Sequence, residues 1–425
     1  MLKRGRYLKR AGSLLIVLVL LPGLANAVLQ KQFSFVAKWG SAMPGNVSSM
    51  FLNFSSPVIN PQMTAFFARG SNNYQAIFTT LPGFLKAQVS NDRQLPLSSG
   101  TIRNFVGSAS EETTAESSRH QLSLSISQNS IAFMATDREM NQGIYRVDPQ
   151  SLHAIATQKI PVPKSKGNFT KLGSPKLINS QCVGFWGEGS QDQGIYLSNS
   201  KKHLKPLVTA GDTLGQKQLK IKRLGDFDFG YRPQKCDMKS LNYAFVAYDK
   251  RNDPVLYQAQ SKGDHYKNLV DSSQSIPGDY IGFFTKINHL SYDKKKNRIA
   301  FVGYGVIDQQ GLFLIDQGKL KPFVTQDTLL PKSPGSFETF KHVNLRGHNV
   351  VFEATGSHEV QGVYLANMEG DQFKILNNQD KLNGKKIHSV KISNQAFIGK
   401  RVVMLVTFEN GQKGILTATL QSKAF

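Results

Sequence analysis

The sequence is poor in several features that mark common protein classes. It has two cysteines in 425 residues, too few for a cysteine-rich zinc module or an iron–sulfur protein. Acidic residues are scarce, with 29 Asp and Glu against 52 Lys and Arg, so the formal net charge is +23. Hydrophobic residues still make up 40%, which excludes an intrinsically disordered chain. The length suits one large core or two to three ordinary domains.

Long apolar runs are missing outside the first residues of the chain. The run from Leu14 to Leu24 follows five cations and precedes Ala25-Asn26-Ala27, a small-x-small cleavage signature. This order predicts a secretory signal peptide over residues 1–27, cleaved after Ala27. A membrane anchor is the alternative, but Leu14–Leu21 is too short to cross a bilayer. We therefore expect an exported protein, periplasmic or secreted, without a transmembrane segment and with a mature charge of about +18.

The motifs of common active sites are absent as well. The sequence has no Gly-x-Ser-x-Gly, no His-Glu-x-x-His, no P-loop and no dinucleotide fingerprint. Its nine histidines are scattered, which favours surface or turn positions. Asp226-Phe-Asp-Phe-Gly230 resembles the start of a calcium loop but lacks the later ligands, so a strand with two outward carboxylates is the better interpretation. We expect no catalytic residues, no metal and no cofactor.

What the sequence does contain is a repeat. A short strand with a central aromatic residue is followed by a polar loop and then by Gln-Gly-aliphatic-aromatic, as in Gln193-Gly-Ile-Tyr196. Chance apolar runs would not keep this second segment at a constant offset, and a repeat of this length is typical of β-propellers. The central residues of the seven copies are Phe66, Phe133, Phe185, Phe245, Phe301, Phe352 and Met404.

Each repeat predicts four short strands, the composition of one propeller blade. The last copy stops after its third strand, Ile415–Leu420, whereas the segment Phe33–Gly45 reads like a fourth strand and its turn. We therefore expect an all-β fold over residues 28–425, a single seven-bladed β-propeller closed by an N-terminal strand that completes the last blade. Two separate β-domains are the alternative. The polar insertion Gly107–His120 is expected to be an exposed loop.

The segment from Asn344 to Phe352 resembles the tandem repeat Asn-x-x-Gly-x-x-x-Ala-Phe of bacterial exported propeller-like proteins. In this resemblance Asn344-Leu-Arg-Gly347 is a hairpin turn in which glycine supplies a positive φ. The segment Ile131–Arg138, followed by Gly143-Ile-Tyr145, is also similar to TolB-type propeller repeats. The first family implies an exported protein without assigned chemistry.

Two sets of residues are candidates for a site or a cross-link. Cys182 and Cys236 flank the same hairpin turn in adjacent repeats, so a disulfide between them is geometrically reasonable; two buried thiols are the alternative. Lysines recur on the strand before that turn, which is the innermost strand of a propeller blade. We expect them either to converge in the central channel or to be solvated separately: Lys176, Lys286, Lys341 and Lys391.

These features favour a non-catalytic binding or scaffold propeller, expected to be a monomer. The loops between second and third strands, such as Thr136–Gln142 and Tyr248–Asp253, form one face of the ring and are a default binding face. The positive charge suggests an anionic glycan, lipopolysaccharide or an acidic protein as partner. Nucleic acid is disfavoured by export and by the lack of basic–aromatic interleaving. The alternative is a polysaccharide lyase or hydrolase with its site at the channel mouth.

Overall fold

The fold is all-β. The computed structural model describes residues 29–81, 83–106, 124–190, 192–199, 203–230, 236, 241–260, 265–278 and 280–421. The predicted signal peptide and the insertion Gly107–His120 lie outside these residues. Besides strands, the described residues form one short 3-10 helix, η1 (Ser71–Asn73). Within the same ranges, no helix combines the length and apolarity needed to cross a membrane.

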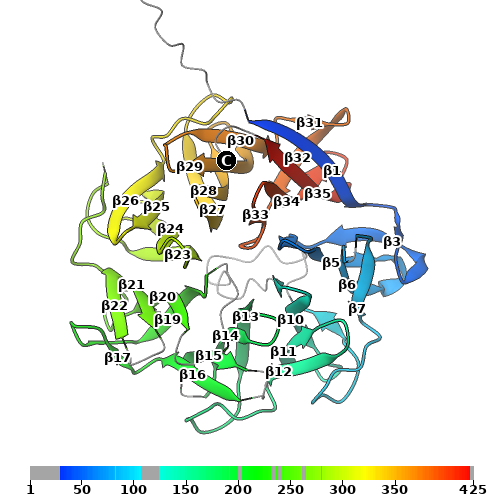
Figure 1. Cartoon of the computed structure of the whole chain (residues 1–425), viewed down its shortest axis with the longest axis horizontal. Helices are drawn as coiled ribbons and strands as arrows, with labels where there is room; N and C mark the ends of the chain where they lie inside the picture. The colour runs from blue at the N-terminus through cyan, green and yellow to red at the C-terminus, as the bar shows by residue number, and fades with distance from the viewer. Residues whose placement is uncertain are drawn as a thin grey trace, which may run out of the picture.

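Seven antiparallel sheets stand around a central axis, which confirms the predicted seven-bladed propeller (Figure 1). We number the blades along the chain. Blades 1 to 3 contain the strands β2 (Ala42–Met43), β3 (Asn46–Phe54), β4 (Val58–Ile59), β5 (Thr64–Gly70), β6 (Gln75–Thr79) and β7 (Lys86–Ser90); β8 (Asn104–Phe105), β9 (Ser125–Ser127), β10 (Ser130–Thr136), β11 (Gln142–Val147) and β12 (Leu152–Thr157); and β13 (Lys171–Leu177), β14 (Val183–Glu188), β15 (Gln193–Ser198) and β16 (Leu204–Thr209).

A small hairpin, β17 (Thr213–Leu214) and β18 (Leu219–Lys220), connects blade 3 to blade 4. Blades 4 to 6 contain β19 (Arg223–Asp228), β20 (Asn242–Tyr248), β21 (Pro254–Gln260) and β22 (His265–Val270); β23 (Lys286–Asp293), β24 (Arg298–Tyr304), β25 (Gln310–Asp316) and β26 (Lys319–Thr325); and β27 (Phe337–Arg346), β28 (Asn349–Gly356), β29 (Val360–Asn367) and β30 (Gln372–Asn377). Blade 7 contains β31 (Lys381–Leu382), β32 (Lys385–Lys391), β33 (Phe397–Ile398), β34 (Arg401–Phe408), β35 (Lys413–Gln421) and, from the other end of the chain, β1 (Gln30–Lys38).

The N-terminal strand closes the ring as the sequence predicts. Strand β1 pairs antiparallel with β35, from Gln30 opposite Gln421 to Lys38 opposite Gly414. Figure 1 shows the two strands side by side, the first in blue and the last in red. Closure matters because an unpaired β35 would leave an edge of free backbone groups open to aggregation.

The two aromatics of the repeat lie directly opposite each other on the second and third strands. In blade 3, Phe185 pairs with Tyr196, and their ring centroids are 5.7 Å apart. Stacked aromatic pairs of this kind stabilise a sheet beyond their buried area. The same register holds in the other blades: Phe66 with Phe78, Phe133 with Tyr145, Phe245 with Tyr257, Phe301 with Phe313, Phe352 with Tyr364, and Met404 with Leu416.

The glycine of the repeat makes room for the aromatic residue two positions later. A Cβ on Gly143 would lie 2.5 Å from the hydroxyl oxygen of Tyr145, and one on Gly194 would lie 2.9 Å from the ring of Tyr196. Residues i and i+2 share one face of a strand, so the ring folds back over the glycine. The Gly-x-Tyr spacing is therefore a packing requirement.

The core lies between blades. The buried apolar residues form seven clusters among the described residues, and each cluster joins two neighbouring blades, including blade 7 with blade 1. A single blade leaves both faces of its sheet apolar, and stacking around the axis covers them. The mature chain therefore folds as a closed ring of mutually dependent sheets.

One expected turn is misplaced. We expected Asn344-Leu-Arg-Gly347 to form a hairpin turn, but β27 runs through Asn344 to Arg346, and the turn is Gly347-His348 with Gly347 at φ 61°. The reason is that the Asn344 side chain is used between blades: its Oδ1 accepts from Ala396 N at 2.8 Å, and its Nδ2 donates to Ser393 O at 2.8 Å.

Candidate binding site in the axial channel

The first strand of each blade lies nearest the axis, where β13, β19, β23 and β27 approach one another in Figure 1. One side chain in the innermost segment of each of several blades bonds to the innermost segment of the next blade, which fixes the spacing of the wall. These bonds join Ser125 Oγ to Leu177 N (2.8 Å), Asp228 Oδ2 to Tyr292 N (2.8 Å), Ser291 Oγ to Leu345 N (2.9 Å), and Ser393 Oγ to Pro57 O (2.6 Å).

Bulges in blades 5 and 6 place two histidines side by side. The pairing of β23 with β24 skips between Asn288 and Ser291, and that of β27 with β28 skips between Lys341 and Asn344. His289 and His342 occupy these bulges in the left-handed region, at φ 52° and 49°. A bulge re-aims a side chain, and the two imidazole rings come within 5.2 Å. Both histidines are half-buried and lie within strands, not in turns.

Three of the four predicted lysines lie close enough to His289 to affect its pKa. Burial holds the pKa of His289 well below its usual range, and His342, Lys341, Lys286 and Lys176 lower it further. Lys286 and Lys341 come from the blades that carry the histidines, whereas Lys176 comes from blade 3. His289 is thus a neutral imidazole within a group of cations at neutral pH.

The lysine ammonium groups are held in different ways. Lys176 Nζ lies 5.9 Å from the centroid of the Phe227 ring in the next blade, and Lys286 Nζ lies 4.9 Å from that of Tyr304. Lys341 is exposed. Lys391 is also exposed and lies near Lys413, whose pKa is lowered first by burial and then by Lys391. Lys176, Lys286 and Lys341 thus share an electrostatic influence on His289, whereas Lys391 acts on Lys413.

Two carboxylates lie on the wall beside Lys176. Burial raises the pKa of Asp226, although Lys176 and two backbone amides act in the opposite direction. Asp226 Oδ2 accepts from Leu290 N at 2.8 Å, in the same way as Asp228 accepts from Tyr292 N. The predicted strand is present, but its two carboxylates do not point outward: both accept hydrogen bonds from backbone amides of blade 5.

A small hollow on the axis links this wall to blades 6 and 7. Its lining includes Lys176 and Asp228 together with Arg346, Asn394 and Gln395. His342 Nδ1 lies 3.1 Å from Asn394 Oδ1, so His342 contacts one residue of the hollow's lining. Sequence reasoning missed these last three residues: Arg346 lies in the repeat-like segment Asn344–Phe352 but at a position without an assigned role, and Asn394 and Gln395 belong to no motif. Among the described residues, no cluster of three His, Cys, Asp or Glu side chains could hold a metal ion.

A wider groove opens between the outer strands of blades 3 and 4, with a volume of about 1330 Å³. It is lined by β16, β22 and the β17–β18 hairpin. An ion pair closes one side, with Lys217 Nζ 2.7 Å from Asp271 Oδ2. Burial alone would raise the pKa of Asp271, but hydrogen bonds from Lys217, Ser273 and Asn268 outweigh it and lower the pKa to about 2. Lysines and aspartates are both present along the groove, so it lacks the cationic excess of the axial wall.

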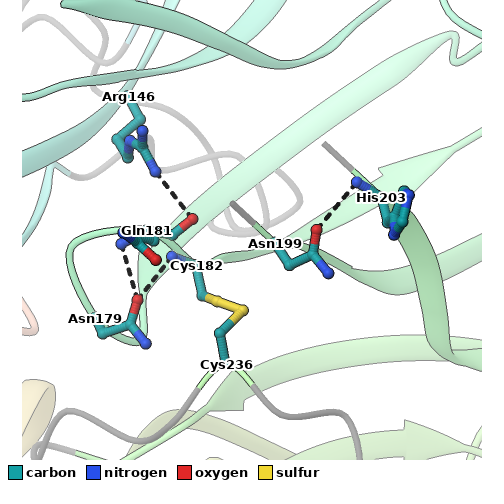
Figure 2. The surroundings of a disulfide bond; sticks show 7 residues. All are labelled: Arg146, Asn179, Gln181, Cys182, Asn199, His203 and Cys236. Atoms are coloured by element: carbon teal, nitrogen blue, oxygen red, sulfur yellow. Dashed lines mark hydrogen bonds between the residues drawn. A yellow bond between two sulfur atoms is a disulfide. The ribbon is translucent and has the colours of Figure 1, made fainter. Parts of the chain in front are cut away.

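The two cysteines lie within disulfide distance of each other, each in the segment between the first and second strands of its blade: Cys182 in blade 3 and Cys236 in blade 4. The structure joins Cys182 to Cys236, with their Cα atoms 5.9 Å apart (Figure 2). The turn before Cys182 is held on both sides: Asn179 Oδ1 accepts from Cys182 N at 2.9 Å, and Arg146 of blade 2 donates to Gln181 O at 2.9 Å. The cross-link therefore joins a well-anchored turn of blade 3 to blade 4.

The loops between second and third strands are ordered by aspartate side chains. Asp137 Oδ1 accepts from the backbone N of Glu139 (3.0 Å) and Asn141 (2.9 Å). In the matching loop of blade 4, Asp249 Oδ1 accepts from Arg251 N (2.9 Å) and Asp253 N (3.0 Å). These loops thus present fixed surfaces on their side of the ring.

Solved structures similar to this chain are propellers. They include an oligogalacturonate lyase in complex with manganese (12% identity, 92% of this chain and 98% of that chain, TM-score 0.50). The β-propeller domain of the Trilobed protease from Pyrococcus furiosus (10%, 88% and 97%, 0.49) and TolB from Acinetobacter baumannii (11%, 69% and 65%, 0.39) are more distant. At such low identity the likeness shows the fold alone.

None of the curated proteins matches the chain. The expected tandem-repeat family is not confirmed; the family model that matches covers residues 29–305, which is more than half of the sequence. The protein belongs to the family of unknown function DUF7453.

Proposed function

We propose that this protein is an exported, non-catalytic propeller that binds an anionic glycan, such as the sugar part of lipopolysaccharide, through its axial wall. The observation that carries the proposal is that Lys176, Lys286 and Lys341, from blades 3, 5 and 6, all act electrostatically on His289, which lies beside His342. Ammonium groups held close together without an equal number of carboxylates attract sulfate, phosphate or carboxylate groups. The high positive charge of the chain draws such ligands toward the ring.

Affinity chromatography on heparin and on immobilised lipopolysaccharide tests this proposal. The double variant Lys286→Gln/Lys341→Gln should elute at clearly lower salt than the wild type, because it removes two of the converging charges. The matched control Lys295→Gln/Lys296→Gln removes the same charge from the turn between β23 and β24, and it should elute near the wild type. Equal shifts for both pairs would mean that only net charge matters. Failure of the wild type to bind at low salt would overturn the proposal.

Export is the second part of the proposal, and it rests on the sequence of residues 1–27. Expression of the full chain in a Gram-negative host should yield a mature protein that begins at Val28 in the periplasm or the medium. Mass measurement of the intact protein shows whether residues 1–27 have been removed. An unprocessed protein retained with the cells would contradict it.

A polysaccharide lyase or hydrolase remains a second candidate because Asp226, whose pKa is raised, lies beside Lys176. An argument against an enzyme is that Asp226 and Asp228 both accept hydrogen bonds from backbone amides of blade 5, which gives the two carboxylates a structural role. Incubation with anionic polysaccharides and detection of new reducing ends or unsaturated products distinguishes the two candidates. Product formed by the wild type but not by Asp226→Asn would favour the enzyme.

A further inference from the structure

The exposed apolar residues are distributed unequally between the two sides of the ring. Because the strands of a blade are antiparallel, the loops between second and third strands and the connections between blades share one side, which we call the loop face. Of the large apolar side chains that the described residues leave exposed, Phe84 is on the opposite side. The others are on the loop face or at its edge: Trp39, Val47, Met50, Leu52, Leu97, Met140, Ile281, Phe283, Ile307 and Leu329.

Two groups of these side chains are prominent. In blade 2, Leu97 (65% exposed) and Met140 (53%) are on neighbouring loops, joined by a hydrogen bond of 2.9 Å from Ser98 Oγ to Asp137 Oδ2. In blade 5, Ile281 (68%) and Ile307 (88%) belong to segments that meet where Gly282 approaches Val306. Each group is fixed in place by contacts between its own loops.

The backbone at these tips is unusual for apolar residues. Leu97, Met140 and Ile307 all have left-handed backbones, at φ 57°, 67° and 57°. This region is unfavourable for residues other than glycine and asparagine, and most of all for a β-branched residue such as Ile307.

The repeat shows that the turns themselves do not require apolar side chains. Leu95-Pro-Leu97-Ser-Ser-Gly100 corresponds to Val162-Pro-Lys164-Ser-Lys-Gly167 and to Leu330-Pro-Lys332-Ser-Pro-Gly335. Lys164 and Lys332 have the same left-handed φ as Leu97, at 65° and 59°. Met140 likewise corresponds to Asn252, at φ 70°. The conformation of these turns therefore does not explain why blade 2 has apolar residues at their tips.

The surroundings of the blade 2 group indicate which surface it meets. Exposed Arg93, Arg103 and Arg138 lie in the same two loops as Leu97 and Met140. Apolar tips beside arginines are the combination that partitions into an anionic lipid interface. Blades 2 and 5 are on opposite sides of the ring (Figure 1), so the two groups do not form the contiguous patch of a protein interface. A flat surface, such as a membrane, can contact both groups of side chains at the same time.

We propose that the loop face docks on an anionic lipid surface, with Leu97 and Met140 on one side of the ring and Ile281 and Ile307 on the other entering the headgroup layer. Docking lays the ring flat with its axis along the membrane normal. The proposal does not depend on the axial lysines.

Vesicle flotation with the mature chain tests the proposal. The wild type should float with phosphatidylcholine vesicles that contain phosphatidylglycerol, and it should bind pure phosphatidylcholine more weakly. The variant Leu97→Lys/Met140→Asn installs the residues that the repeat itself uses at these positions, so the fold is preserved. Its partition onto anionic vesicles should fall at least about tenfold, because two apolar side chains no longer leave water. The added lysine should strengthen binding to anionic vesicles. A decrease in binding can therefore be assigned to the loss of the two apolar side chains.

Three comparisons complete the test. Phe84→Ser removes an equally exposed apolar side chain from the opposite side and should float like the wild type. Lys286→Gln/Lys341→Gln should also float normally, and Leu97→Lys/Met140→Asn should retain heparin binding, which separates this surface from the axial site. Failure of the wild type to float, or equal flotation of Leu97→Lys/Met140→Asn, overturns the proposal. A wild-type dimer that this variant dissociates, without vesicle binding, would assign the face to self-association and also overturn it.

Discussion

The side chain of Gln361 pairs with both backbone groups of Val390 in the next blade. Its Oε1 accepts from Val390 N at 2.9 Å, and its Nε2 donates to Val390 O. Gln310 makes the same two bonds to Phe340, and Gln193 accepts from Leu224 N. The glutamine of the repeated Gln-Gly motif is therefore a bridge between blades. It bonds to backbone groups of the first strand in the next blade, on the edge of that strand that is not paired with another strand.

Replacement of this glutamine by an isosteric apolar residue should loosen the ring. Gln361→Leu leaves the amide and carbonyl of buried Val390 without their partner, so we expect a loss of about 1–3 kcal/mol in the free energy of unfolding. Denaturant titration of the mature protein measures it. Gln62→Leu alters an exposed glutamine in a turn and should change stability by no more than a few tenths of a kcal/mol. Equal stability of both variants would refute the bridging role.

A methyl group on the repeat glycine should be poorly tolerated. In Gly143→Ala the new Cβ would lie 2.5 Å from the hydroxyl oxygen of the buried Tyr145, so the ring must move within a packed core. We expect a loss of about 1–3 kcal/mol in stability. The loss should be smaller when Gly143→Ala is made in a Tyr145→Leu background, because the clash is then absent. Strictly additive effects in this double-mutant cycle would contradict the packing argument.

The cysteine pair predicts a redox-dependent stability. The two cysteines are separated by 54 positions, and closing a loop of this length in the unfolded chain is worth about 4 kcal/mol in the chain-entropy model. Mass measurement of the unreduced mature protein should find no free thiol. Cys182→Ala/Cys236→Ala should match the reduced wild type in denaturant midpoint, and both should lie below the oxidised protein. Two alkylatable thiols in the exported protein would exclude the bond.

Asp271 predicts a pH-dependent contribution to stability. Its pKa is about 2 in the folded protein, against about 3.9 in an unfolded chain, so the folded state favours the ionised carboxylate. The contribution, about 2 kcal/mol, is complete above the unfolded pKa and is lost as the pH falls through the folded pKa. The stability difference between wild type and Asp271→Asn should therefore shrink between pH 5 and pH 2. A difference that stays constant over this interval would show that the carboxylate charge is not what stabilises the groove.

The sequence by itself determined the blade number and the closure of the ring. Residues that pair across one hairpin, such as Phe185 and Tyr196, are close along the chain. Their spacing is therefore nearly the same in every blade and can be recognised as a repeat in the sequence. The same holds for the missing fourth strand at the end of the chain and for the spare strand at its beginning, because every blade needs an edge partner. These are local requirements, repeated in every blade, and a period in the sequence records them.

Only the tertiary structure decided which of the recurring lysines share a site. Lys176, Lys286 and Lys341 do not occupy equivalent register positions, being opposite Gly184, Tyr304 and Glu353, yet all three act electrostatically on His289, which lies in the bulge of blade 5. Lys391 follows the same sequence pattern but is near Lys413. A shift of one residue turns a strand side chain to the other face, and no local pattern records where such a shift occurs. The axial site is therefore a product of ring closure and register, which become visible only when all the blades are in place.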